Sequence, residues 1–250
     1  MRGGLYFLPR KLSFASYKDI LTRSTFLHSI LVTLARTAVG TPLAVLATTA
    51  LAYVLSRKEL LWKKPITLLF IFTMYFGGGL VPYYMVLKNL GMLNNFIVFI
   101  FPNLVSVYNM ILVRNYIEGM PDALFEAAKI DGANDLTIFF RLVLPLSKPI
   151  IATVAVFVAV GHWNSWFDVM LYNSSGKWDT LQVYLRKILL ESEQASRLLS
   201  EQKQYAFMKN LTTSSIRAAT TMIVTIPIVC IYPFLQKYFV GGITIGAVKG

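Results

Sequence analysis

The chain has 250 residues, of which 56% are hydrophobic and 14% are charged, and its formal net charge is +12. With a mean hydropathy of +0.58, this composition is too apolar for a soluble domain and indicates a polytopic membrane protein. The charge excess does not indicate nucleic-acid binding, because no basic cluster is interleaved with aromatic residues for stacking bases. Lysine and arginine of a membrane protein gather at the membrane surfaces instead.

Five apolar segments are long enough to cross a bilayer, whose hydrocarbon core needs about 20 apolar residues per helix. Residues 1–25 precede them and are predicted to form an outer amphipathic segment. They do not form a signal peptide, because no apolar region follows Arg2. The transmembrane domain therefore covers residues 26–240, and residues 241–250 form a tail. Its predicted spans are residues 26–55, 66–88, 94–113, 149–172 and 218–240.

The loop after the first predicted span indicates the orientation of the chain. Basic residues outnumber Glu59 in this short loop, and they are Arg57, Lys58, Lys63 and Lys64. Short basic loops stay on the cytoplasmic side of the membrane. The chain is therefore expected to begin outside. Counting spans then places residues 114–148 in the cytoplasm, residues 173–217 outside and the tail inside.

Two of the predicted spans contain residues that are unusual in a membrane helix. The second span has a glycine run and a proline, which indicate a kink, a close helix crossing or unwound backbone along a cavity. Close helix packing is the simplest of these interpretations. The fourth span has polar residues and tryptophans in its outer half, which face a partner helix or an aqueous path, or anchor the helix at the interface. The candidate substrate-pathway residues are Gly77, Gly78, Gly79, Trp163, Asn164, Trp166 and Asp168.

The outer loop, residues 173–217, contains apolar residues at the spacing of one helical face. They are Leu181, Tyr184, Leu185, Ile188 and Leu189, and they predict an amphipathic surface helix. No metal site is predicted, because His28 and His162 lie far apart without clustered ligands. Cys230 stands alone in an apolar run, which favours a packing role.

A charged stretch separates the third and fourth spans. Its nine charged side chains are Arg114, Glu118, Asp122, Glu126, Lys129, Asp131, Asp135, Arg141 and Lys148. At about 2.5–3.5 kcal/mol per charge at the bilayer centre, insertion would cost about 25 kcal/mol. The stretch therefore stays in water.

Within this stretch the residues predict a helix, a turn and a second helix. Pro121 and Asp122 suit a helix start, and Gly132 is placed to end that helix in a left-handed conformation. Leu136, Phe139 and Phe140 would lie on one side of the second helix. Two apolar faces held in water, without a core of their own, imply a protein partner.

Three groups of residues in this stretch resemble the EAA loop of permease subunits from binding-protein-dependent ABC importers. They are Glu126-Ala127-Ala128, Asp131-Gly132-Ala133 and Leu142-Val143-Leu144-Pro145, with Leu142 at a position where the family usually has isoleucine. The resemblance implies that the two helices dock into a cleft of a cytoplasmic ATPase subunit. The implied docking residues are Phe125, Glu126, Ala127, Ala128, Asp131, Gly132, Ala133, Phe139, Arg141 and Pro145.

The resemblance also implies a fold and a set of partners. The fold is all-α, a polytopic membrane helical bundle of the importer permease type. The family has six spans with an inside N-terminus, so about five are expected here, with the first family span missing. The implied partners are a second homologous permease, two ATPase subunits, an external solute-binding protein and membrane lipid in the bacterial cytoplasmic membrane. The chain is not expected to be an enzyme or to bind a cofactor, since it lacks a phosphate loop, and ATP and Mg²⁺ would bind the ATPase.

The nearest subgroup by resemblance imports complex or uronic-acid oligosaccharides of the alginate type. The residues that carry this resemblance are Phe76 to Pro82, His162 to Asp168 and Ile243 to Gly250. The expected outer segments are basic overall, which would steer an anionic oligosaccharide. Attraction to lipid headgroups or to a neighbouring subunit explains the same charge equally well.

Two other classes of protein fit the sequence less well than an ATP-driven importer. A secondary, ion-coupled transporter should carry carboxylates at mid-membrane and internal repeats. Asp168 is the only acidic residue within a predicted span, and no clear repeat is found. A non-transporting scaffold would not need a charged docking segment behind a glycine-rich helix.

Overall fold

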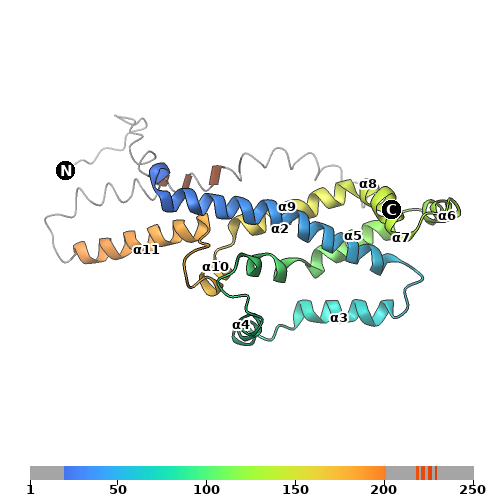
Figure 1. Cartoon of the computed structure of the whole chain (residues 1–250), viewed down its shortest axis with the longest axis horizontal. Helices are drawn as coiled ribbons and strands as arrows, with labels where there is room; N and C mark the ends of the chain where they lie inside the picture. The colour runs from blue at the N-terminus through green and yellow to red at the C-terminus, as the bar shows by residue number, and fades with distance from the viewer. Residues whose placement is uncertain (1–19, 201–217, 220, 223–224, 227–228, 230–250) are drawn as a thin grey trace.

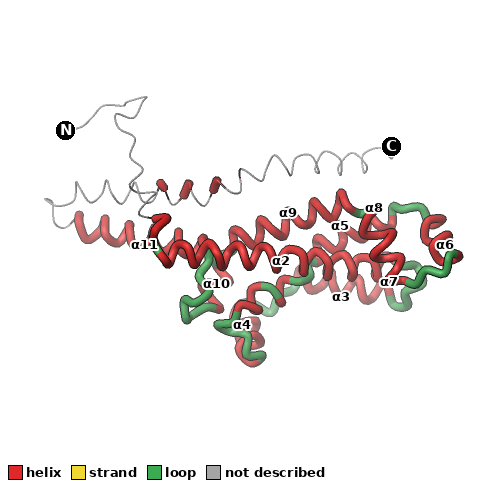
Figure 2. Tube along the Cα trace, turned by 45° about the horizontal axis from the view of Figure 1, so that its top comes forward, coloured by secondary structure: helices red, strands yellow, loops and turns green. Residues whose placement is uncertain are grey.

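The computed structural model describes residues 20–200, 218–219, 221–222, 225–226 and 229, and every regular element within these residues is a helix (Figure 2). The expected all-α class is therefore confirmed. Several predicted features lie outside the described residues. They are residues 1–19, residues 201–217 of the outer loop, most of the last span, Cys230 and the tail.

The longest element is α2, Ser24–Ser56, and the other described helices are arranged along and around it (Figure 1). Its bounds agree with the first predicted span. Within the described part of the chain, α2 is the one continuous helix that is long and apolar enough to cross a membrane. The number rises to four if each of three bent helix pairs counts as one span.

One face of α2 is lined with small side chains, and this face packs against α5, Val107–Glu118, and α9, Lys148–Asn164. Its small buried residues are Ser29, Thr33, Gly40, Ala44, Thr48, Thr49, Ala52 and Ser56. The other side of α2 exposes Leu31, Leu43 and Val54. Small residues let membrane helices approach closely, and this approach provides the van der Waals contact that holds them together.

The second predicted span is two helices rather than one. α3, Lys63–Tyr75, and α4, Leu80–Asn89, meet at an angle of 112°. The break falls on the glycine run, where Gly79 has φ +89°, a value that glycine adopts without strain. A Cβ atom at Gly77 would meet nothing within 4 Å. The close-packing interpretation is therefore wrong for contacts within the described chain, and the run serves as a kink.

The third predicted span begins irregularly. Two short 3₁₀ helices, η1 at Phe96–Phe99 and η2 at Phe101–Asn103, precede α5, and the axis bends by 43°. Ser106 caps α5, since its hydroxyl accepts a hydrogen bond from the amide of Asn109 at 3.3 Å. α5 then continues to Glu118, five residues beyond the end of the predicted span.

The charged stretch folds as α6, Asp122–Ile130, and α7, Asp135–Ile138. We call these two helices the elbow. The chain continues without a loop through the π-helix η3, Phe139–Val143, and the short α8, Leu144–Leu146. An angle of 82° then separates the segment that ends at Leu146 from α9.

The fourth predicted span is also interrupted, because α9 ends at Asn164 and α10, Phe167–Tyr172, starts after a two-residue break. α11, Leu181–Ser200, begins at the first residue of the predicted amphipathic face. Leu181 and Ile188 are buried, and the Tyr184 ring lies 5.4 Å from that of Phe26 in α2. The predicted amphipathic helix is confirmed, and it lies at the opposite end of α2 from α6 (Figure 1).

The substitution Gly40→Ala tests the close contact between α2 and α9. A Cβ atom at this position would lie 2.6 Å from Nε2 of His162, so Gly40→Ala forces two packed helices apart. Overpacking of this kind costs about 1–3 kcal/mol, or a fall in Tm of about 2–10 °C for a chain of this size. The matched control is Gly161→Ala, because a Cβ atom there meets nothing within 4 Å. Thermal unfolding in mild detergent should show the loss for Gly40→Ala alone, and equal Tm values for both variants would contradict the packing.

Candidate functional site

The turn of the elbow depends on Gly132, as its sequence predicts. Gly132 has φ +76° and follows α6 as its left-handed terminator. The amide of Ala133 donates to the carbonyl of Ala128 at 2.9 Å, and the amide of Gly132 donates to that of Lys129 at 3.0 Å. Asn134 then starts α7, because its side chain accepts from the amide of Thr137 at 2.8 Å. The two helix ends thus satisfy their free backbone groups within a few residues.

One face of the elbow is buried in the chain's own core. Phe125 is 8% exposed and Phe139 is 5% exposed, and the Phe139 ring lies 5.6 Å from that of Tyr53. The guanidinium of Arg57 lies 4.9 Å from the centre of the Phe125 ring. The expectation that the elbow has no core of its own is therefore wrong. Phe125 and the half-buried Ala128 of α6, with Phe139 of the adjoining η3, hold the elbow against the end of α2 and do not form its outer surface.

The other face of the elbow is exposed. Among the predicted docking residues, the exposed ones are Glu126, Ala127, Asp131, Gly132, Arg141 and Pro145, and Ala133 is half-buried. Four further apolar side chains are exposed, namely Leu124, Ile130, Leu136 and Phe140. They belong to the apolar faces for which the sequence implies a protein partner, although the resemblance does not place them among the docking residues. Ile130 is 86% exposed and Leu136 is 69% exposed. Exposed apolar side chains on a segment that carries so many charges indicate a protein contact.

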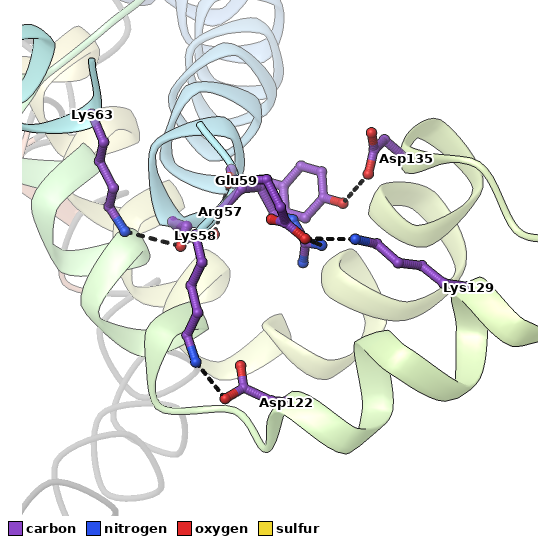
Figure 3. A network of polar contacts seen from close by, with 9 residues as sticks. Arg57, Lys58, Glu59, Lys63, Asp122, Lys129 and Asp135 are labelled. Atoms are coloured by element: carbon purple, nitrogen blue, oxygen red, sulfur yellow. Dashed lines mark hydrogen bonds and ion pairs between the residues drawn. The ribbon is translucent and has the colours of Figure 1, made fainter. Parts of the chain in front are cut away.

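Ion pairs connect the elbow to the loop between α2 and α3 (Figure 3). Lys58 lies 2.6 Å from the Asp122 carboxylate, and Lys129 lies 2.6 Å from the Glu59 carboxylate. The hydroxyl of Tyr53 donates to the Asp135 carboxylate at 3.3 Å. These contacts join both elbow helices to the end of α2 at Ser56 and to the loop that follows it.

A second group of charges joins α3 to α5. Lys63 and Arg114 both donate to the carboxylate of Glu118, at 2.8 Å and 3.0 Å. Arg114 also donates to the hydroxyl of Thr67 at 2.9 Å. Burial raises the pKa of Glu118, but the hydrogen bonds from Lys63 and Arg114 outweigh it and hold the pKa below its usual value. Glu118 therefore stays ionised and ties the start of α3 to the end of α5.

A pocket of about 470 Å³ is lined by residues of α2, α4, α5, α9 and α10 and of the 3₁₀ helices before α5, and by none of the elbow. Hydroxyl, amide and aromatic side chains line it, among them Tyr83, Asn103, Ser106, Asn109, Phe167 and Tyr172. Its charged lining residues are Arg36 and Asp168. The pocket thus offers hydrogen-bond donors and acceptors beside aromatic rings.

Arg36 is the centre of a buried ionic cluster at this pocket. It is 2% exposed, and its guanidinium donates to the Asp168 carboxylate. Nε of Arg36 also donates to Nδ1 of His162 at 3.2 Å, and the guanidinium lies 5.1 Å from the centre of the Phe99 ring. Ser165 and the amide of Val169 hold the other oxygen of Asp168, at 2.6 Å and 2.8 Å. A buried charge needs such pairing.

Among the predicted pathway residues, Asp168 alone lines this pocket. The Asn164 amide accepts a hydrogen bond from Gln182 at 3.1 Å, and Trp163 packs against the cluster that contains Phe26 and Leu181. The guanidinium of Arg186 lies 3.9 Å from the centre of the Trp166 ring. Gly77, Gly78 and Gly79 are exposed and lie outside the lining. These six residues therefore do not join Asp168 in the lining of the pocket.

Sequence reasoning missed Arg36, although a signal was present. Arg36 is the only charged residue between positions 26 and 55, and ionisable residues inside membrane helices mark functional sites and face a partner. The partner lies 132 residues away in sequence, so the pair itself was not visible in any local pattern.

Comparison with known proteins decides the family. Residues 13–245 match the model of the family described as binding-protein-dependent transport system inner membrane component. The chain belongs to this family. Permeases of such systems work with an ATPase and a solute-binding protein and are not themselves enzymes. The membership leaves the secondary-transporter alternative without support.

Relatives and a solved structure match this permease over nearly its whole length. It is 38% identical to the polygalacturonan/rhamnogalacturonan transport system permease protein YtcP of Bacillus subtilis, across 97% of this chain and 84% of that protein. It is 29% identical to the melibiose/raffinose/stachyose import permease protein MelC of the same organism, across 98% and 84%. A crystal structure of a bacterial ABC transporter involved in the import of the acidic polysaccharide alginate aligns with a TM-score of 0.83 at 30% identity, across 95% of this chain and 84% of that one.

The ion pair between Glu59 and Lys129 should be visible in the pH dependence of stability. The hydrogen bond from Lys129 lowers the pKa of Glu59 from 4.5 to about 2. Because the pKa of Glu59 is lower in the folded chain than its ordinary value of 4.5, the ion pair stabilises the fold at pH values above 4.5. This stabilisation is lost as the pH falls toward 2. We expect the Tm of Glu59→Gln to lie below that of the wild type, by at most about 4 °C for an exposed pair.

This Tm difference, measured in mild detergent, should stay constant from pH 8 to about 5 and narrow below about pH 4. Lys129→Gln serves as the matched variant, since it removes the other partner and should behave in the same way. A difference that is as large near pH 2 as at pH 7 would show that the pair does not contribute through its charge.

Proposed function

We propose that this permease is a transmembrane subunit of an ATP-driven importer of oligosaccharides in the bacterial cytoplasmic membrane. The observation that carries the proposal is its similarity, over nearly its whole length, to permeases of sugar transport systems. The pocket beside Arg36 supports a sugar, because amide, hydroxyl and aromatic side chains are suited to sugar hydroxyls and ring faces. A second permease, two ATPase subunits and an external solute-binding protein complete the transporter.

The elbow is the part of the permease that meets the ATPase in this proposal. Glu126 is exposed on α6, and exposed apolar side chains lie nearby at Leu124, Ile130 and Leu136. This combination of one carboxylate and an apolar surface fits a protein cleft rather than water. Closure of the ATPase pair would move the elbow, and the helices behind it would switch the pathway between its two sides.

The substrate is an oligosaccharide that carries carboxylates. Polygalacturonan and alginate, which appear in the descriptions of two similar proteins, are both built from uronic acids. Exposed basic residues at the end of the molecule near α11 support this choice, namely Lys177, Arg186 and Lys187. The similarity to a melibiose/raffinose/stachyose permease favours a neutral oligosaccharide as the second candidate.

Glu126→Arg tests the docking role of the elbow. The exposed carboxylate becomes a cation on the face that would meet the ATPase. The amount of ATPase that co-purifies with the permease in mild detergent should therefore fall at least about tenfold. The control is Glu191→Arg, which makes the same change on the exposed face of α11. It should retain the ATPase at the wild-type level. If the wild-type permease retains no ATPase, or if both variants retain it equally, the docking assignment fails.

Competition between matched oligosaccharides tests the substrate class. Proteoliposomes that contain the whole transporter and its binding protein would take up a labelled oligogalacturonate, with either an unlabelled oligogalacturonate or stachyose as competitor. We expect the acidic competitor to inhibit at a concentration at least about tenfold lower. Uptake of the acidic sugar should also fall with added salt, because the basic outer surface is screened. Equal inhibition by both sugars, without salt dependence, would favour the neutral candidate.

A further inference from the structure

Three consecutive residues after α2 contact three residues of α6. The loop between α2 and α3, which we call the α2–α3 loop, spans residues 57–62. Lys58 pairs with Asp122 and Glu59 pairs with Lys129 (Figure 3). The Arg57 guanidinium lies over the Phe125 ring. Positions 122, 125 and 129 share one face of α6, since their spacing is three and four residues. One face of α6 is therefore fastened to the loop along its length.

The positions of the two ion pairs prevent α6 from pivoting on the loop. Asp122 is the first residue of α6, and Lys129 lies in its last turn. Seven residues of α-helix separate them by about 10 Å. Each pair alone is exposed and weak, but a rotation of α6 about one pair would break the other. The buried Phe125 between them closes the contact from the inner side.

The covalent route from the elbow to the transmembrane helices is less direct. It passes through the π-helix at Phe139–Val143 and then through a bend of 82° before α9. A π-helical turn and a sharp bend are places where a helix deforms. α2, in contrast, is one uninterrupted α-helix from Ser24 to Ser56, and it continues through Pro42 without a break.

The same helix carries Arg36, whose guanidinium holds Asp168 and His162 at the pocket. Arg36 lies 20 residues before Ser56 along α2, a distance of about 30 Å. α2 thus connects the elbow at one end to the ionic cluster at the pocket. Gly40, packed on the His162 ring, brings α9 into contact with α2 between these two places.

We propose that the α2–α3 loop is part of the coupling element of this permease. Arg57, Lys58 and Glu59 act as positioning residues that fix α6 to the end of α2, so that the elbow and α2 move as one body. Displacement of the elbow then reaches the Arg36–Asp168 pair through α2, rather than only through the bend before α9. This inference rests on the proposed function in one respect, because it takes the elbow to be moved by an ATPase.

A charge-reversal cycle at Glu59 and Lys129 tests the fastening. The complete transporter would be reconstituted with wild-type permease, Glu59→Lys, Lys129→Glu and the double variant, and the substrate imported per ATP hydrolysed would be measured. Each single variant should lower this ratio by about threefold to tenfold, because like charges then face each other. The double variant should return to within about twofold of the wild type. Lys64→Glu, an exposed lysine that takes no part in the three contacts, should leave the ratio unchanged.

Covalent linkage separates a coupling role from a purely structural one. Glu59→Cys and Lys129→Cys would be combined in a Cys230→Ser background, and the two thiols would be joined by a short bismaleimide. The linked permease should import at the wild-type ratio, because the loop and α6 move together. The same protein blocked with N-ethylmaleimide should show the lowered ratio, since the ion pair is missing and nothing replaces it.

Two outcomes would overturn the inference. If linkage stops transport, the loop and α6 must separate during the cycle. If the double charge reversal does not recover the ratio, the pair acts in some way other than by fastening α6. In both cases the proposed function would still be supported if the wild-type permease retains the ATPase and Glu126→Arg loses it. Absence of ATPase from the wild-type complex would instead overturn that function first.

Discussion

The described helices depend on close packing along one face of α2. Gly40, Ala44 and Ala52 bring α9 and α5 close to the α2 backbone, and in a membrane this contact takes the place of the hydrophobic effect. Two functional regions follow from it. The packing positions His162 and Asp168 to meet Arg36, and at the other end it provides the buried surface that receives Phe125 and Phe139.

Features that depend on local chemistry were predictable from the sequence. The elbow turn was predicted because glycine at position 132 is one of the few ways to end a helix in a left-handed conformation. The amphipathic α11 was predicted because its apolar residues follow the helical period. The break in the second span was among the alternatives for the glycine run, but its angle of 112° depends on packing that no local pattern records.

Features that depend on contacts between distant residues were not predictable. A helix face that contacts a partner and a helix face buried in the chain's own core show the same spacing of apolar residues in the sequence. The sequence therefore predicts a partner contact for Phe125 and Phe139, which the structure buries instead. Trp163 and Asn164 looked like pathway residues because they are polar or aromatic in a span, but they turn toward Leu181 and Gln182 of α11. Arg36 was readable as an intramembrane charge, whereas its pairing with Asp168 required the fold.

The length of α2 has a consequence for where the permease meets its partners. At 33 residues the helix is about 50 Å long, whereas the hydrocarbon core is about 30 Å thick. If the helix stands upright, about 20 Å of it extends beyond the hydrocarbon core, shared between its two ends. The elbow contacts the α2–α3 loop at one of these ends. The exposed ion pairs that hold the elbow therefore lie outside the low dielectric of the hydrocarbon core, and dissolved salt weakens them.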